Sequence, residues 1–168
     1  MDTNALIARM EAFPAALGAL VAPLPAEEAR RRPAEGKWSV LEVLGHLIDE
    51  EAQDFRVRTK STLEDPTRAW PPLDPEGLVA ARKWNEHDAR ELVSKFRDER
   101  GASVAWLRSL ASPDWSRARA HPRLGTIRAG DLLASWVAHD ARHLGQLARN
   151  LYGSIEATTV PYSLAYAG

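Results

Sequence analysis

The chain has 168 residues, close to the usual size of one domain, and 45% of them are hydrophobic and 27% charged, which argues against a disordered chain. Its 22 basic residues balance 23 acidic ones, and a net charge of -1 lacks the basic excess typical of a nucleic-acid-binding protein. The absence of cysteine excludes disulfides, thiolate zinc sites and a cysteine nucleophile, so any metal must be held by His, Asp or Glu.

The first predicted helix covers residues 4–21, where apolar side chains recur at spacings of three and four. Pro14 lies inside it, and we expect this proline to bend the helix or to divide it into two pieces. A short helix is predicted next at residues 25–32, because its leading proline suits the first helical position.

The second long helix has the clearest start in the sequence. Ser39 and Glu42 form the pattern of a capping box, in which the serine hydroxyl accepts from an amide of the first turn and the glutamate reaches back to the serine amide. Trp38, just before the cap, is expected to pack on the first turn. The apolar stripe that follows predicts a helix to about Thr59.

The rest of the chain divides into two connections, two helices and a tail. Four prolines between residues 64 and 75 predict a long connection that crosses the bundle or covers a site. No segment shows a convincing alternation typical of strands. The remaining predicted segments are a third helix from Glu76 or Asn85 to Leu110, a connection over 111–130, a fourth helix over 129–152 ended by Gly153, and a tail over 154–168. Together these patterns predict an all-α four-helix bundle with at least one long crossover connection.

The start of the chain and its hydropathy bear on location. No basic segment followed by an apolar run opens the sequence at Met1, and uninterrupted apolar stretches are only a few residues long. We therefore expect a soluble, cytoplasmic protein that contacts neither membrane nor nucleic acid. Its length predicts a single domain over residues 1–168.

Three of the five histidines have a spacing that points to metal binding. His139 and His143 are four residues apart in the fourth predicted helix, so both imidazoles project from one face, as in helical zinc sites. His46 lies at the edge of the apolar stripe of the second helix, and with the facing pair it completes three neutral nitrogen ligands that suit Zn²⁺, Ni²⁺ or Fe²⁺. Taken singly, the pair could equally be two surface histidines, and His46 a packed interfacial one. His87 lies in a polar segment and is interpreted as solvated, and His121 is interpreted as a turn histidine that could alternatively line the mouth of a site.

An acidic residue lies where the fourth helix should be buried. Asp140 falls near the centre of the apolar face, where an unpaired carboxylate is costly, so it needs a partner. Either it orients a ligand histidine, or it pairs with an arginine across the bundle. Hydrolysis would also need a general base, and Asp49, Glu50 and Asp140 are the candidates nearest to the histidines in the sequence.

Two blocks of the sequence resemble a known family. The string GKWSVLEVLGHL at residues 36–47 resembles the W-S-x-x-x-x-x-x-H-L signature of the DinB-like superfamily. The later block that resembles this family consists of HPRLGTI at 121–127, DLL at 131–133 and HDARHLGQL at 139–147. The spacing between the two blocks also fits, and the resemblance covers about residues 4–152.

The resemblance implies an up-down-down-up four-helix bundle, commonly a homodimer, with a divalent metal held by His46, His139 and His143. Three protein ligands leave a coordination position open, which is the arrangement of catalytic sites. Within the superfamily the sequence looks closest to the YfiT-like metal-dependent hydrolases. Other relatives are S-transferases that use bacillithiol or mycothiol, and maleylpyruvate isomerases.

The family's reactions imply a small-molecule substrate and leave several functions open. Because the chain has no cysteine, a thiol reaction would need an external low-molecular-weight thiol, whose carboxylates Arg142, Arg128 or Arg123 could hold. The leading hypothesis is a metal-dependent hydrolase or thiol S-transferase. The alternatives are a metal-binding or interaction bundle without catalysis, and a helical dimer in which the histidines are merely packed.

Overall fold

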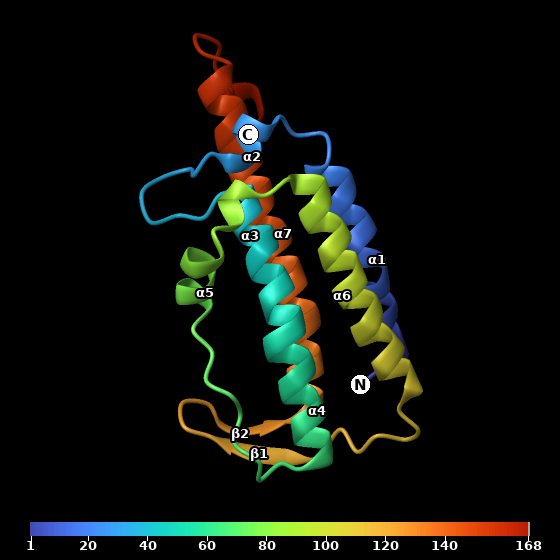
Figure 1. The fold of residues 1–168 in the computed structure, drawn as a ribbon. Helices are drawn as coiled ribbons and strands as arrows, with labels where there is room; N and C mark the ends of the chain where they lie inside the picture. Colours follow the sequence, from blue (N-terminus) through green and yellow to red (C-terminus); the bar gives the residue numbers. More distant parts are fainter. Residues whose placement is uncertain (168) are drawn as a thin grey trace.

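Four long helical segments lie side by side in the computed structural model, which describes residues 1–167 (Figure 1). They are α1 (Thr3–Val21), a continuous stretch made of α3 (Val40–Asp49), η1 (Glu50–Phe55) and α4 (Arg56–Glu64), then α6 (Ala89–Ser109) and α7 (Ala129–Thr158). Helices α1 and α7 run towards one end of the bundle, and the other two segments run the opposite way. The predicted four-helix bundle and its up-down-down-up order are confirmed. Gly168, the last residue of the predicted tail, lies outside the described residues.

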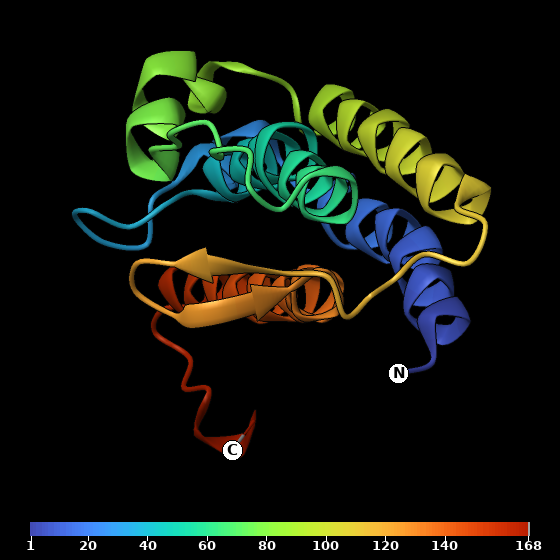
Figure 2. The same cartoon turned by 90° about the horizontal axis from the view of Figure 1, so that it is seen from below.

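The four segments form a ring when the bundle is seen from below (Figure 2). Helix α1 packs on α6, α6 on α3, α3 on α7, and α7 on α1. The two helices that carry the histidines of interest therefore lie against each other. A short helix, α2 (Ala26–Arg30), connects α1 to α3 close to where it was predicted.

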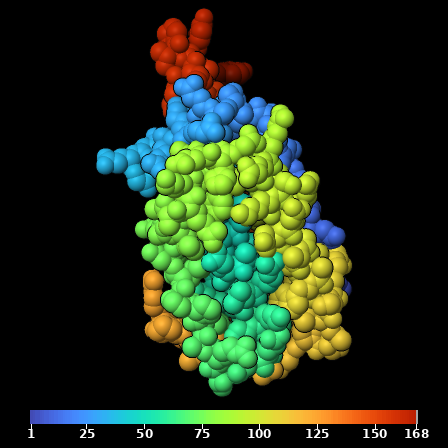
Figure 3. Space-filling model, viewed as in Figure 1, coloured from blue at the N-terminus to red at the C-terminus, as the bar shows by residue number. Residues whose placement is uncertain are grey.

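The long crossover connection is also confirmed. It runs from α4 back over the outer face of α3 and contains α5 (Pro75–Arg82) and η2 (Trp84–Glu86) (Figure 3). Lys83 separates these two elements with a φ of 51°. Helix α6 begins after Asp88, whose side chain accepts hydrogen bonds from two amides of the first turn. The third predicted helix is thus divided: its predicted starts, Glu76 and Asn85, lie in α5 and η2, and α6 itself begins later, at Ala89.

The connection predicted over 111–130 contains a β-hairpin that the sequence analysis did not predict. Strand β1 (Ala118–His121) pairs antiparallel with β2 (Gly125–Arg128). Each strand has only four residues and is largely exposed, so no apolar alternation marks it in the sequence. Gly125 has a φ of +74° at the start of β2, a conformation that glycine adopts without strain.

Helix α3 begins as predicted. The hydroxyl of Ser39 accepts from the Glu42 amide at 3.2 Å, and the Glu42 carboxylate accepts from the Ser39 amide at 2.9 Å. Every residue of this helix is buried, and a Cβ added at Gly45 would lie 2.0 Å from the ring of Trp84. Only glycine therefore allows the crossover to pack this closely on the helix.

Helix α1 is continuous through Pro14, so the division that was one of the two predicted outcomes does not occur. A proline lacks the amide that would bond to the carbonyl four residues earlier, which here belongs to Met10. The Met10 carbonyl instead accepts a hydrogen bond from Nη1 of Arg100 at 3.2 Å. Helix α6 thus supplies the donor that the proline removes.

Two helices end later than predicted. The stretch predicted to end near Thr59 continues through the π-helical turn η1 to Glu64, and α7 passes Gly153 and ends at Thr158. Gly153 has a helical backbone and not the left-handed conformation with which glycine ends helices. Ser154 after it is buried against the bundle. The first residues of the predicted tail are therefore helical, and η3 (Ala165–Ala167) follows.

The apolar core has two parts. One lies among α1, α3 and α6 and includes Leu44 and Phe96, and the other surrounds Trp136 on α7. Helix α1 is the one helix of the described residues that is long and apolar enough to cross a membrane by length and composition. The core helix of a soluble bundle meets the same criterion, and Met10 and Leu17 of α1 are fully buried in the two core parts.

Candidate metal centre

Three histidines from two helices meet between α3 and α7. Nε2 of His46 lies 3.3 Å from Nε2 of His139, which lies 3.0 Å from Nε2 of His143. His139 and His143 are one turn apart on α7, and the capping box that starts α3 positions His46 on its second turn. The structure thus brings together all three residues that the sequence analysis selected. We refer to them as the histidine cluster.

The histidine cluster has the dimensions of a metal site. Metal–nitrogen bonds of about 2.0–2.1 Å in tetrahedral geometry separate neighbouring ligand atoms by about 3.3 Å. The ligand atoms of the cluster all lie within 4.8 Å of one another. No other group of three His, Asp or Glu side chains meets in this way in residues 1–167. The cluster can therefore hold a divalent metal ion.

Burial sets the charge of the histidine cluster. Burial, together with the charges of His143 and Arg142, lowers the pKa of His46 and that of His139 to about 3. Burial also lowers the pKa of His143, although its bond to Gln146 opposes the change. All three imidazoles are therefore neutral near pH 7, and their lone pairs are free to bind a metal.

The Nδ1 atoms of His143 and His46 differ in their hydrogen bonding. Nδ1 of His143 donates to Oε1 of Gln146 at 2.8 Å, so its Nε2 carries the lone pair that faces the cluster. Nδ1 of His46 is buried without a hydrogen-bond partner, 3.9 Å from the Glu50 carboxylate. One histidine is thus fixed in the tautomer that binds a metal through Nε2, and a second has an acid within reach.

The histidine cluster opens into a cavity of about 840 Å³. Trp38 packs against His46 with ring centroids 4.8 Å apart, and Phe55 packs against His139 with centroids 5.1 Å apart. The basic side chains that line the cavity are Lys37, Arg142 and Arg149. The cavity is large enough to admit a small molecule beside the histidines.

Of the three acids considered as general bases, one lines this cavity. Burial and the neighbouring Asp54 raise the pKa of Glu50 to about 8. Asp49 is instead held in an ion pair with Arg82 at 3.1 Å. The third acid, Asp140, belongs to a different cluster.

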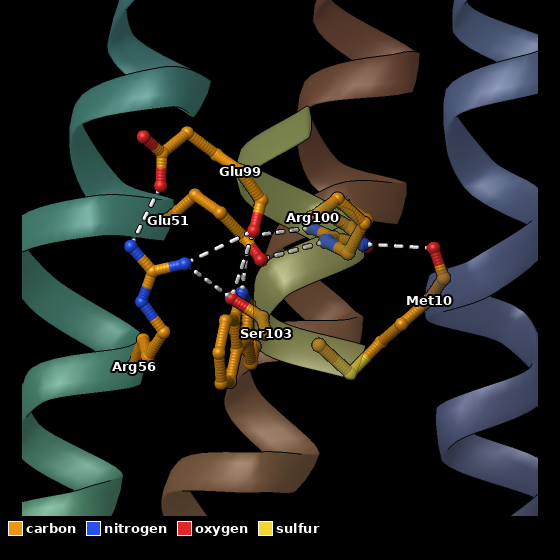
Figure 4. A network of polar contacts seen from close by, with 8 residues as sticks. Met10, Glu51, Arg56, Glu99, Arg100 and Ser103 are labelled. Carbon is orange, nitrogen blue, oxygen red and sulfur yellow. Dashed lines mark hydrogen bonds and ion pairs between the residues drawn. The ribbon is translucent and has the colours of Figure 1, made fainter. Parts of the chain in front are cut away.

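A buried polar network is centred on Arg100, and we call it the Arg100 cluster (Figure 4). Asp140 belongs to it through its hydrogen bonds with Arg100. Arg100 is only 2% exposed, and its guanidinium donates to Glu51 twice at 2.9 Å and to Asp140 at 2.7 and 2.8 Å. Nε1 of Trp136 donates to the same Glu51 at 2.8 Å, and the Met10 carbonyl accepts the remaining Arg100 proton. Of the two alternatives for Asp140, the arginine pair is therefore confirmed.

The remaining candidates from the sequence lie apart from the histidine cluster. His87 is at the end of the crossover and His121 is in β1, so neither reaches it. Arg142 lines the cavity, whereas Arg128 pairs with Asp131 at 2.9 Å and Arg123 lies in the hairpin turn.

Comparisons with known proteins agree with this fold. A sequence model of the DinB superfamily matches residues 9–147. A solved structure described as YfiT from Bacillus subtilis, a probable metal-dependent hydrolase with an unusual four-helix bundle topology, is similar with a TM-score of 0.76 and 24% sequence identity. The alignment covers 89% of this chain and 87% of that one. No curated protein sequence gives a significant match.

Proposed function

This chain belongs to the DinB superfamily, and from that premise we propose that it is a metal-dependent enzyme that acts on a small molecule at His46, His139 and His143. The observation that carries the proposal is the convergence of three neutral imidazoles on a cavity of about 840 Å³. Three protein ligands leave one position of a tetrahedral metal open to substrate, as in catalytic zinc sites. Zn, Ni and Fe all suit this donor set.

The chemistry divides between the metal and the residues of the chain. A divalent ion supplies a Lewis acid that polarises a carbonyl group or lowers the pKa of a water or thiol ligand. Glu50 lies in the cavity wall, where its carboxyl group can take up or deliver a proton. Gln146 holds the proton of His143 on Nδ1, and Trp38 keeps bulk water from one side of His46.

Two reaction classes fit this site, hydrolysis and the transfer of a low-molecular-weight thiol. The similarity to a structure described as a probable metal-dependent hydrolase supports the first. Because the chain has no cysteine, the second would use a thiol from solution. A metal-binding bundle without catalysis is the second candidate function. It is favoured because two of the three acids considered as general bases, Asp49 and Asp140, are held in ion pairs.

Metal content is the first test. Protein purified without a histidine tag is expected to hold about one equivalent of Zn, Ni or Fe by elemental analysis, and His46→Ala, His139→Ala and His143→Ala are each expected to lose it. His87→Ala is the matched control and should retain the metal, because His87 lies outside the cluster. A wild-type protein that stays metal-free after reconstitution with all three metals would contradict the proposal.

A second experiment separates catalysis from metal binding alone. Glu50→Gln keeps the size of the side chain and removes its proton chemistry, so it should retain the metal and lose turnover of ester or thiol-transfer substrates. Equal turnover in this variant and the wild type would remove Glu50 from the mechanism. Metal binding with no turnover by either protein would support the non-catalytic alternative.

We also propose that the protein is a cytoplasmic homodimer, as the family resemblance implies. Sedimentation velocity on the purified chain tests the dimer directly. A single species with the mass of one chain, 18.6 kDa, at micromolar concentration would contradict it.

A further inference from the structure

The cavity beside the histidine cluster is rich in positive charge. Lys37 borders it from the loop before α3, and Arg142 and Arg149 border it from α7. No carboxylate of residues 1–167 forms an ion pair with any of these three side chains. The three charges are therefore available to a molecule that enters the cavity.

One face of α7 presents hydrogen-bond donors along the cavity. Arg142, Gln146 and Arg149 follow one another at spacings of four and three residues, so they share a face of the helix and span about 10 Å along its axis. Oε1 of Gln146 already accepts from His143, which leaves its NH2 group for a ligand. This row of donors begins beside the histidine cluster and leads away from it.

Acidic side chains offset this charge only in part. The acids that line the cavity are Glu50 and Glu76. Glu50 is buried near Asp54, whereas Glu76 is exposed in the first turn of α5. The outer part of the cavity thus has three cations against one exposed acid.

We propose that the substrate carries an oxyanion, a carboxylate or a phosphate group, which Arg142 and Arg149 hold while the reacting bond lies at the histidine cluster. The position of the reacting bond rests on the proposed function, and the oxyanion site does not. Guanidinium groups bind such oxyanions through paired, charge-assisted hydrogen bonds. A nucleic acid does not fit, because following its backbone needs a longer row of basic groups than the three present.

Calorimetric titration of the full chain with three matched probes tests the oxyanion site. The probes are phenylacetate, phenyl phosphate and the neutral phenylacetamide. The anions should bind and the amide should not, and added NaCl should weaken the binding because the cations are exposed. The tighter of the two anions identifies the oxyanion that the site prefers.

Substitutions then assign the binding to the row on α7. Arg142→Ala and Arg149→Ala should each weaken anion binding by about tenfold. Arg9→Ala is the matched control, because Arg9 is an exposed arginine on α1 outside the cavity. Circular dichroism confirms that each variant is folded. The proposal is overturned if the amide binds as tightly as the anions, if neither anion binds, or if both cavity variants bind like Arg9→Ala.

The metal-free His139→Ala variant distinguishes a failure of this inference from a failure of the proposed function. If His139→Ala still binds the anions in a manner that depends on Arg142, the oxyanion site stands even where the wild type takes up no metal. If the wild type holds a metal but its anion binding ignores Arg142 and Arg149, this inference fails and the proposed function remains.

Discussion

His139 and Asp140 are adjacent on α7, yet they belong to two polar clusters of opposite character. The guanidinium of Arg100 makes five hydrogen bonds, to two carboxylates and one backbone carbonyl, which uses every donor that it has. In the histidine cluster, the Nε2 atoms of the three imidazoles face one another across 3.0 and 3.3 Å, and Nδ1 of His46 has no partner. The Arg100 guanidinium has all its hydrogen-bond partners, whereas the histidine cluster lacks at least one.

This difference indicates a structural role for the Arg100 cluster and a ligand-binding role for the histidine cluster. A buried polar network that satisfies all its members gains nothing from a ligand and loses much if one member is removed. A buried polar group without a partner is costly by itself, and ring nitrogens that converge on one point gain when a cation binds to their lone pairs. The Arg100 cluster therefore holds α1, η1, α6 and α7 together, and the histidine cluster is free to take a metal between α3 and α7.

The largest effect expected of a single substitution is that of removing Arg100. Arg100→Met leaves the carboxylates of Glu51 and Asp140 buried without their partner, so the free energy of unfolding should fall by about 3–5 kcal/mol. Urea denaturation measures this change. Arg97→Met on the exposed side of the same helix is the control, with an expected change within about 0.5 kcal/mol. A loss below about 1 kcal/mol for Arg100→Met would contradict a structural role for the network.

The second effect is an increase in the free energy of unfolding when a metal binds to the histidine cluster. Zn²⁺ at one hundred times its dissociation constant should raise the free energy of unfolding of the wild type by about 2.7 kcal/mol. His139→Ala should gain nothing, whereas His87→Ala should gain as much as the wild type. Thermal unfolding with and without the metal tests this, and a similar gain in His139→Ala would place the metal elsewhere.

Lowering the pH should destabilise the metal-free protein through two residues of the histidine cluster. His46 and His139 have pKa values of about 3 in the folded state, below the ordinary value of 6.5. Well above pH 6.5 both are neutral in either state, so they do not alter stability there. As pH falls below 6.5, the unfolded chain takes up protons that the folded one refuses, and stability should fall by up to about 1.4 kcal/mol per pH unit for each histidine, until the pH nears 3.

Urea denaturation of metal-free protein between pH 7 and pH 4 measures this slope. The double variant His46→Ala/His139→Ala should show a shallower decline, because it lacks both titrating groups. If the double variant and the wild type lose stability in parallel, the histidine cluster does not carry the pH dependence.

The smallest effect concerns the helix that both clusters use. Ser39→Ala removes the cap of α3 and should cost about 1 kcal/mol, the typical value for an N-cap. Metal affinity should change little, because the rest of the buried helix still positions His46. A large loss of metal affinity with unchanged stability would mean that the cap acts on the histidine cluster directly.

The sequence located the whole histidine cluster, but of the Arg100 cluster it indicated only that Asp140 needs a partner, with an arginine as one alternative. The four-residue spacing of His139 and His143 is a local pattern, and His46 was selected by its place at the edge of the apolar stripe of its helix, a choice that the DinB-like blocks then supported. Arg100 lies in a stretch of α6 that is rich in charged residues, where an arginine resembles a solvated side chain. Its partners are 49 and 40 residues away along the chain, so only the packing of the bundle brings them together.

Helix boundaries show the same limit of local patterns. The capping box of Ser39 and Glu42 is complete within four residues and was predicted correctly. Whether Pro14 divides α1 depends on a donor from α6, and whether Gly153 ends α7 depends on the backbone conformation that it adopts. The hairpin strands are too short and too exposed to leave a pattern.

The π-helical turn η1 makes one helix serve both clusters. Such a turn contains one residue more than α-helical winding would use. Because the wider turn takes up the extra residue, deleting a single residue within 50–55 would restore α-helical winding and leave α3 and α4 close to their present faces. His46 would keep its place, and the change would fall on the residues of the turn itself, among them Glu51 of the Arg100 cluster. In evolutionary terms the extra residue is an insertion kept inside a helix, and this segment should resist further changes of length more strongly than the loops do.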